Sequence, residues 1–314
     1  MAPKILCVVG PTASGKTKMG VALAKAFCGE VVSVDSMQIY RGMSIGTAAP
    51  TPDEMDGVPH HMVAVAEPSE SWSVARFCGM ADACIQDILR RGKLPVLVGG
   101  TGLYLDALVR GTDFAAGSSD GKVRAALQER ATREGMESLL SELRQIDPEA
   151  AARLHLKDEK RIIRALEIWQ ETGITMTEHD RRTREIPPKY DAVYIGLDFA
   201  DRQDLRERIN ARVDSMIEAG LLQEVQNLLG AGLPRNATAL QAIGYKQFLA
   251  VEEGLITEKD AVEEIKLRSR QYAKRQLTWL RRNSSIHWIY WEKEPNFSRG
   301  LQKATEILTA EGLG

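Results

Sequence analysis

The chain of 314 residues lacks several features that mark special classes of protein. It has four cysteines (Cys7, Cys28, Cys78 and Cys84), without a C-x-x-C pair or a histidine at zinc-ligand spacing. Neither a disulfide framework nor a zinc finger is therefore supported, and reduced thiols fit a cytosol. No apolar run reaches the roughly 18 residues of a membrane-spanning helix, and the one near the N-terminus is too short for a secretory signal. We therefore expect a cytoplasmic chain with no membrane partner.

An excess of charge of one sign is also lacking, because 41 basic and 43 acidic residues leave a formal net charge of −2. With 44% hydrophobic residues, the chain is expected to form one large core and a smaller lobe. The basic residues are nevertheless clustered at 160–164, at 181–184 and along 265–291, a stretch with no acidic residue. Solvated arginines are the ordinary explanation for any one cluster. Three clusters on a weakly acidic chain favour a phosphate backbone as partner.

A phosphate-binding loop is the most specific pattern present. It follows the apolar run Ile5–Val9 and precedes a helical pattern, and it reads Gly10-Pro11-Thr12-Ala13-Ser14-Gly15-Lys16-Thr17. Its glycines let backbone N–H groups close around an anion at a helix N-terminus, Lys16 adds positive charge, and the Thr17 hydroxyl is a ligand for Mg²⁺. The alternative is a tight turn without a ligand, which the flanking strand and helix patterns disfavour.

The fold class predicted is α/β, a P-loop core with a parallel sheet flanked by helices and an inserted all-helical lobe. Short apolar runs alternate with helix-length segments, as in parallel sheets with crossover helices. The expected strands are Ile5–Val9, Val31–Val34, Met62–Val65, Pro95–Val98 and Ala192–Leu197. The predicted parts are a first core segment at 1–117, a helical lobe at 118–189 and a second core segment at 190–314 with basic terminal helices. The last long helix is expected to begin at the capping box Thr257-x-x-Asp260.

Asp35 is the sharpest single candidate outside the loop. It ends a buried strand, where a lone carboxylate is costly unless it meets a cation or a polar partner. It would serve there as a base or as a Mg²⁺ partner, whereas the plain alternative is a helix N-cap. The strand at 95–98 ends in Gly99-Gly100 without an acid, which weakens a plain NTPase interpretation. The pair His60-His61 is interpreted as structural rather than as a substrate contact. The aromatic residues near the last basic cluster are interpreted as core residues rather than as groups that stack on bases; they are Trp279, Trp288, Tyr290 and Trp291.

Taken in order, these residues resemble the tRNA dimethylallyltransferase family, also called tRNA isopentenyltransferases, of the bacterial type. The resemblance covers nearly the whole chain. It rests on the octapeptide and on Asp35-Ser36-x-Gln38-x-Tyr40-x-Gly42, Ile45-Gly46-Thr47-Ala48-x-Pro50, Pro59-His60, Leu97-Val98-Gly99-Gly100-Thr101-Gly102-Leu103-Tyr104, Arg161-x-x-Arg164-Ala165-Leu166-Glu167, Gln241-Ala242-Ile243-Gly244-Tyr245-Lys246 and Lys274-Arg275-Gln276-x-Thr278-Trp279.

The resemblance implies transfer of a dimethylallyl group from dimethylallyl diphosphate to the exocyclic N6 amine of the adenosine adjacent to the anticodon in tRNA, with release of diphosphate. In the family the P-loop holds the diphosphate of the prenyl donor instead of ATP, which accounts for the missing second acid. Asp35 is then the general base, while Thr12, Lys16 and Thr17 hold the donor and its Mg²⁺. Thr101 lies near the target base. Arg212 stabilises the leaving diphosphate, with Arg208 on the same helix flank.

The resemblance also assigns residues to the contact with tRNA. These are Asp35, Ser36, Met37, Gln38, Thr101, Arg124, Lys160, Arg161, Ile162, Ile163 and Arg164, and the segment Gln241, Ala242, Ile243, Gly244, Tyr245 and Lys246. The metal ligand is Thr17. A monomer is expected by default.

Three other functions stay open on the residues alone. A P-loop kinase for a small molecule or nucleotide would use the same loop, but it would leave the basic clusters without a task. A prenyltransferase acting on free adenine nucleotides would likewise not need the helical lobe. A nucleotide-gated RNA-binding module would bind RNA without consuming a prenyl donor.

Overall fold

The computed structural model describes residues 2–112 and 121–313, apart from the side chain of residue 184. The chain forms two compact units, Met1–Val109 with Lys189–Gly314, and Arg110–Pro188. The predicted boundary at 117/118 lies outside the described residues. The first unit contains a discontinuous core, and the described residues of the second contain helices and no strand.

The core is built on a six-stranded sheet in which every neighbouring pair is parallel, in the order β3-β2-β4-β1-β5-β6. The strands are β1 Lys4–Val9, β2 Gly29–Val34, β3 His60–His61, β4 Leu94–Gly99, β5 Asp191–Phe199 and β6 Ile286–Trp291. Val9 is in register with Gly99 of β4 and Gly196 of β5. The carboxyl ends of these strands therefore meet at one edge, where ligands of such sheets bind.

Four of the five predicted strands are confirmed, and the predicted P-loop sheet flanked by helices is the fold observed. The strand predicted at Met62–Val65 is wrong, because Met62 and Ala64 adopt positive φ angles of 63° and 51° that no strand accommodates. The paired residues are instead His60 and His61, which precede this segment. Strand β6 was not predicted.

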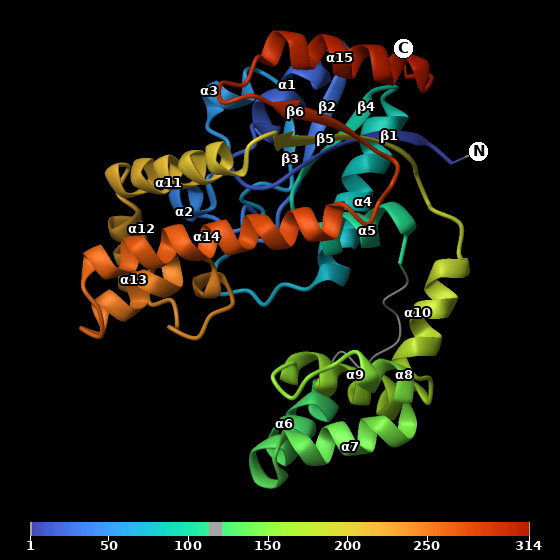
Figure 1. The fold of residues 1–314 in the computed structure, drawn as a ribbon, viewed down its shortest axis with the longest axis vertical. Coiled ribbons are helices and arrows are strands. Elements are labelled where there is room, and N and C mark those ends of the chain that lie inside the picture. Colours follow the sequence, from blue (N-terminus) through green and yellow to red (C-terminus); the bar gives the residue numbers. More distant parts are fainter. Residues whose placement is uncertain (1, 113–120, 314) are drawn as a thin grey trace. The chain divides into compact units, whose positions relative to one another are not determined.

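Helices cover both faces of the sheet (Figure 1). On one face α1 (Lys16–Ala26) packs with α15 (Phe297–Ala310), and on the other lie α4 (Val74–Arg90) and α5 (Gly102–Arg110). Further helices of this unit are α2 Ser44–Thr47, α3 Pro52–Met55, α11 Arg202–Glu218, α12 Leu221–Gly230, the 3₁₀ turn Ala239–Gln241, α13 Tyr245–Glu252 and α14 Glu258–Leu280. The predicted capping box of α14 is confirmed, with Thr257 accepting from the Asp260 N–H. Helix α14 packs against both α11 and α13.

The second unit is a small helical lobe. Its helices are α6 Lys122–Glu134, α7 Met136–Ile146, α8 Pro148–Ala152, α9 Glu159–Thr172 and α10 Met176–Glu185. Leucines of α6 and α7 pack on Ile162, Ile163 and Leu166 of α9 in a core of their own. Within the described ranges of the chain, no helix is both long enough and apolar enough to cross a membrane.

Candidate active site

The P-loop joins β1 to α1 at the carboxyl edge of the sheet. Gly15 has a φ of 85°, which only glycine adopts without strain, and a Cβ on Gly10 would lie 2.4 Å from the Leu197 carbonyl oxygen. No side chain caps the start of α1, so its first N–H groups are left for an anion. Lys16 Nζ donates to the Pro11 carbonyl oxygen at 2.7 Å, which folds the lysine back over the loop. The backbone here has the form of an anion cradle.

Two cations and one carboxylate converge on this cradle. The pKa of Lys16 is lowered to about 7, by burial first and then by the positive charge of Arg212, while Asp35 acts in the opposite direction. Burial also lowers the pKa of Arg212 in α11, against the opposing charges of Asp35 and Glu54. An anion bound beside Lys16 and Arg212 would relieve their repulsion. The structure thus brings Lys16, Asp35 and Arg212 together, as the sequence predicted.

Arg208 lies one turn before Arg212 on α11 and also reaches the loop. Its Nε is 3.5 Å from the Ala13 carbonyl oxygen, and its guanidinium stacks over Phe199 at 5.5 Å from the ring centroid. The side chain is exposed, whereas Arg212 is half-buried. Arg212 is therefore the better placed of the two to face a bound anion.

Asp35 follows β2 and uses one of its two oxygens locally. Oδ1 accepts hydrogen bonds from the N–H groups of Met37 at 2.8 Å and Gln38 at 3.3 Å. These bonds hold a turn and not the helix N-cap considered as the alternative, because the next helix, α2, begins only at Ser44. No hydrogen bond to Oδ2 is found in the part of the chain that the structure describes. A carboxylate fixed by one oxygen with the other oxygen directed elsewhere is suited to accept a proton.

Thr101 occupies the turn between β4 and α5. Its hydroxyl oxygen is buried and has no partner of normal hydrogen-bond geometry among the described residues. Tyr272 of α14 lies close to it, and burial together with the charge of Asp35 raises the pKa of Tyr272 to about 12. Tyr272 thus remains a neutral phenol beside Asp35 and Thr101. Tyr272 was not predicted, because a tyrosine in a basic helix resembles a surface residue in the sequence.

Helix α14 and strand β6 supply two more loop contacts that the sequence analysis missed. Buried Gln276 accepts a hydrogen bond from the Thr12 N–H at 2.9 Å. Trp291 Nε1 donates to the Ser14 carbonyl oxygen at 2.9 Å, and its ring packs on Phe297, which lies against Gly15. Trp291 is a core residue, as expected, but it also supports the loop.

Glu224 of α12 links the family motif at 45–46 to Tyr245 in the predicted RNA-contacting segment 241–246. Its carboxylate accepts from the N–H groups of Ile45 at 2.9 Å and Gly46 at 3.0 Å and from the Tyr245 hydroxyl at 2.5 Å. Gln38 in turn donates to the Ala48 carbonyl oxygen at 3.0 Å. Of the segment 241–246, the side chains of Ala242 and Tyr245 are buried, which leaves Gln241 and Lys246 exposed.

In the lobe, Arg124 and Arg164 share one buried carboxylate. Glu167 accepts from Arg124 at 3.1 and 2.8 Å and from Arg164 at 2.8 Å, although its own side chain is only 4% exposed. Lys160 and Arg161 are exposed, and Arg161 has a single long contact with Asp158 at 3.9 Å. Ile162 and Ile163 are buried in the lobe core. The residues of the lobe that were predicted to contact tRNA are thus of three kinds: two exposed cations, two arginines held by Glu167 and two core residues.

In the basic clusters at 181–184 and 265–291, several cations form ion pairs, so the net positive charge is smaller than the sequence indicates. Arg181 and Arg182 both pair with Glu178. In α14, Lys266 pairs with Asp214 of α11 at 2.7 Å, and Arg268 pairs with Glu264 at 2.6 Å. The acid-free stretch 265–291 is thus partly neutralised by Asp214 from α11 and by Glu264, which directly precedes it in α14.

The donor set around Thr17 fits Mg²⁺ held mainly by a ligand's phosphates. Among the described residues there is no cluster of three or more acidic, histidine or cysteine side chains that would hold a metal by itself. Mg²⁺ is commonly bound by one or two protein oxygens together with substrate phosphates and water. Thr17 follows Lys16 in the first turn of α1 and is only half-buried, so it meets that requirement.

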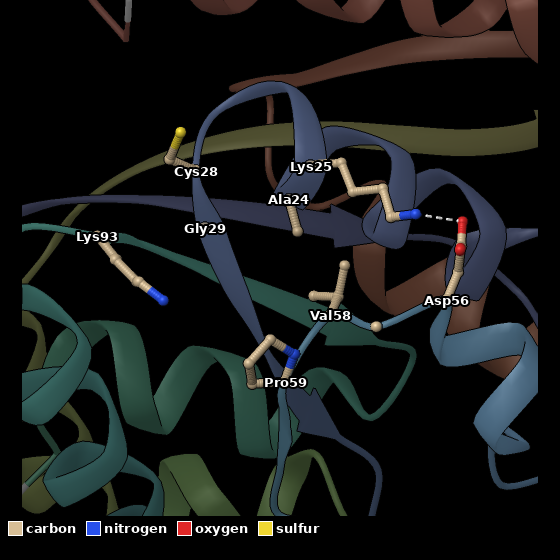
Figure 2. A pocket seen from close by; sticks show the side chains of 9 residues that line it. Ala24, Lys25, Cys28, Gly29, Asp56, Val58, Pro59 and Lys93 are labelled. Atoms are coloured by element: carbon tan, nitrogen blue, oxygen red, sulfur yellow. Dashed lines mark ion pairs between the residues drawn. The ribbon is translucent and has the colours of Figure 1, made fainter.

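A hollow at the opposite, amino edge of the sheet is a poorer candidate (Figure 2). It lies beside the end of α1 and the start of β2, and its lining includes Lys25, Cys28, Asp56 and Lys93. Lys25 pairs with Asp56 at 2.5 Å, and Lys93 pairs with Glu30 at 2.8 Å. Its charges are already balanced, in contrast to those at the P-loop. His61 also binds Glu30, at 2.8 Å, which supports the structural interpretation of that histidine.

Comparisons of sequence agree with this geometry. The chain matches a family model described as IPP transferase over residues 38–283 and one described as isopentenyl transferase over residues 3–64. A protein of Geobacillus thermodenitrificans named tRNA dimethylallyltransferase is 48% identical over 290 residues, which cover 92% of this chain and 91% of that protein. A protein of the same name from Caldanaerobacter subterraneus is 45% identical over 312 residues, which cover 99% of each.

Comparisons of structure give the same family. A full-length tRNA isopentenylpyrophosphate transferase from Bacillus halodurans is 42% identical with a TM-score of 0.73, and the match covers 99% of this chain and 96% of that one. A eukaryotic dimethylallyltransferase captured acting on tRNA is 28% identical with a TM-score of 0.81, covering 99% of this chain and 80% of that one.

Proposed function

This chain belongs to the IPP transferase family, and we propose that it transfers the dimethylallyl group of dimethylallyl diphosphate to the N6 amine of an adenosine beside the anticodon of tRNA. The observation that carries the proposal is the pair of mutually repelling cations, Lys16 and Arg212, at an anion cradle that also faces Asp35. A diphosphate at the cradle and an amine at Asp35 would meet at one edge of the sheet.

The cations act on the leaving group. An adenine amine is a poor nucleophile, so the allylic C–O bond must loosen early, giving a transition state with allyl-cation and diphosphate character. As the bond breaks, its electron pair stays on the diphosphate, where Lys16 and Arg212 face the growing charge. Each positioned cation of this kind contributes on the order of 3 kcal/mol. Thr12 is proposed to hold the donor from the same loop.

Asp35 acts on the nucleophile. As the N6–carbon bond forms, the amine becomes more acidic, and Oδ2 of Asp35 takes its proton while Oδ1 keeps the carboxylate fixed in its turn. Thr101 and Tyr272 supply polar groups for the base, which must leave its stack to reach the donor. Mg²⁺, held by Thr17 and the phosphates, would supply further charge neutralisation on the diphosphate.

Exposed cations supply the proposed contact with tRNA. Lys160 and Arg161 are exposed at the start of α9, and Gln241 and Lys246 are exposed in the core unit. The cations Lys160, Arg161 and Lys246 would neutralise backbone phosphates without reading sequence, and the neutral amide of Gln241 would add hydrogen bonds. A monomer in the cytoplasm is proposed as the working form.

The deciding experiment is incubation with radiolabelled dimethylallyl diphosphate, Mg²⁺ and bulk tRNA. We expect label in the tRNA from the parent protein and none from Lys16→Ala. AMP in place of tRNA is the control acceptor, and label in AMP alone would indicate a prenyltransferase for free nucleotides. ATP turnover without a prenyl donor would instead indicate a kinase.

A further inference from the structure

Gln276 is a buried amide on the inner face of α14, which it shares with Ala273 and Leu277. It is 6% exposed, while Lys274, Arg275 and Thr278 face solvent. Its Oε1 accepts from the Thr12 N–H at 2.9 Å, and its Nε2 donates to the Gly100 carbonyl oxygen at 3.1 Å. Because one partner is a donor and the other an acceptor, an amide meets both, whereas a carboxylate or an apolar side chain does not. One side chain thus joins the P-loop to the end of β4.

The contact between Gln276, the P-loop and the end of β4 leaves no room for a side chain at Gly100. A Cβ there would lie 2.2 Å from Gln276 Nε2 and 2.9 Å from the Gly10 carbonyl oxygen. The start of the P-loop, the end of β4 and the middle of α14 therefore meet at one point. A shift of one of these segments is transmitted to the other two, because closely packed groups do not move independently.

Trp279, almost one turn further along α14, makes a second contact with the segment that follows β4. Its Nε1 donates to Asp106 Oδ2 at 2.7 Å, and its ring would lie 2.2 Å from a Cβ on Gly102. Thr101 is thereby held between Gly100, which Gln276 binds, and Gly102, which Trp279 covers. Thr12 and Thr101 are positioned by the same face of α14.

We infer that Gln276 is a positioning residue that couples the donor-binding P-loop, through the Thr12 N–H, to the acceptor-side turn at Thr101, through the Gly100 carbonyl. This rests on the proposed function, in which the two sides carry the two substrates. Gln276 sets the relative placement of the reacting groups and does not touch them. An error of about 1 Å in such placement costs roughly 100-fold in rate.

The kinetic test compares Gln276→Met, which removes both hydrogen bonds at similar side-chain length, with Gln271→Met on the exposed part of the same helix. We expect kcat for prenyl transfer to fall about 10- to 100-fold in Q276M while the KM for each substrate changes less than about threefold. Q271M should match the parent. Gln276→Glu keeps the acceptor for Thr12 and regains a donor for Gly100 only when protonated, so its activity relative to the parent should rise as the pH falls.

A second measurement keeps the inference testable without turnover. Hydrogen–deuterium exchange should show peptides spanning 10–17 and 99–104 exchanging faster together in Q276M and unchanged in Q271M. Parent-like kcat in folded Q276M, or faster exchange in one peptide alone, overturns the coupling. Failure of the parent to label tRNA overturns the proposed function instead, and the exchange result still decides the coupling.

Discussion

At the scale of single residues, the proposed function assigns different tasks to the two oxygens of Asp35. Oδ1 holds the turn through the N–H groups of Met37 and Gln38, so a substitution at this position must preserve that oxygen to be informative. Asp35→Asn keeps an oxygen for the turn and removes the basic oxygen. We expect its turnover in single-turnover labelling of tRNA to fall roughly 10²- to 10⁴-fold, the usual contribution of a positioned base.

The control for this variant is tRNA binding at equilibrium, which should stay within about twofold of the parent because the turn is preserved. Turnover within a few-fold of the parent would remove Asp35 from the proton transfer. An equal loss of binding and turnover would show that the carboxylate acts in tRNA recognition.

Lys16 is expected to make donor binding depend on pH. Its pKa in the free protein is lowered to about 7, so a large share of the lysine is neutral at pH 8. A bound diphosphate favours the charged form and raises this pKa, so binding takes up a proton above about pH 7. Affinity for dimethylallyl diphosphate should therefore fall as the pH rises from 7 to 9, as measured by calorimetry.

The control is Lys16→Arg, whose guanidinium stays charged over this range. Titration of the ligand itself is common to both proteins, so the difference between their pH profiles isolates Lys16. Identical profiles would show that the lysine is already fully charged in the free protein.

At the scale of elements, α9 separates two kinds of arginine that the sequence presents alike. Arg161 is 71% exposed, whereas Arg164 helps to neutralise the buried Glu167. Arg161→Ala should weaken tRNA binding and flatten the log–log salt dependence by about 0.7 to 0.9 without changing the melting temperature. Arg164→Ala should also destabilise the lobe by about 1–3 kcal/mol, because it takes a charged hydrogen bond from a buried carboxylate.

Salt titrations of tRNA binding and thermal melts of both variants provide the measurement. If Arg161→Ala binds tRNA with the parent's salt slope, α9 does not contact the phosphate backbone. If Arg164→Ala melts like the parent, Arg124 alone satisfies Glu167.

Sequence patterns within short windows predicted the elements that are determined by residues close together in the chain. The P-loop, α14 with its Thr257 cap and four strands follow from spacing within short windows. Strand β6 was missed although Ile286–Trp291 is a short apolar and aromatic run like those of the predicted strands, because its aromatic residues were interpreted only as core packing beside a basic cluster. The positive φ angles of Met62 and Ala64 could not be predicted, because neither residue is a glycine, the residue that usually marks such a conformation in a sequence.

Of the candidate site, the sequence likewise predicted only part. Lys16 and Asp35 were singled out from local motifs and Arg212 from the family resemblance. Gln276 lay within a quoted motif but received no role, and Tyr272 was not singled out, because their partners lie far away in sequence. Gln276 binds a residue 264 positions earlier, and no window of sequence contains both. The balance of charge in α14 was likewise hidden, since Asp214 comes from α11.

At the scale of the whole molecule, the two units predict separable responses to the two substrates. Dimethylallyl diphosphate with Mg²⁺ should protect the P-loop and α14 from hydrogen–deuterium exchange and leave α6–α10 unchanged, whereas tRNA should protect α9. At 100 times its Kd the donor should stabilise the core unit by about 2.7 kcal/mol, more than ATP at equal concentration. Greater protection by ATP would favour the kinase interpretation.

The discontinuous core also bears on how the protein is made. The P-loop is complete in sequence by Thr17, yet the groups that hold it come from Arg208, Gln276, Trp291 and Phe297. Strand β1 likewise has β5 as a neighbour, which is synthesised only after the whole lobe. During translation β1 must therefore remain unpaired on one side until β5 has emerged, and the P-loop lacks its last contacts until Trp291 and Phe297 have followed. The first segment to be synthesised is among the last to reach its working form, so the nascent chain is expected to depend on chaperones over that interval.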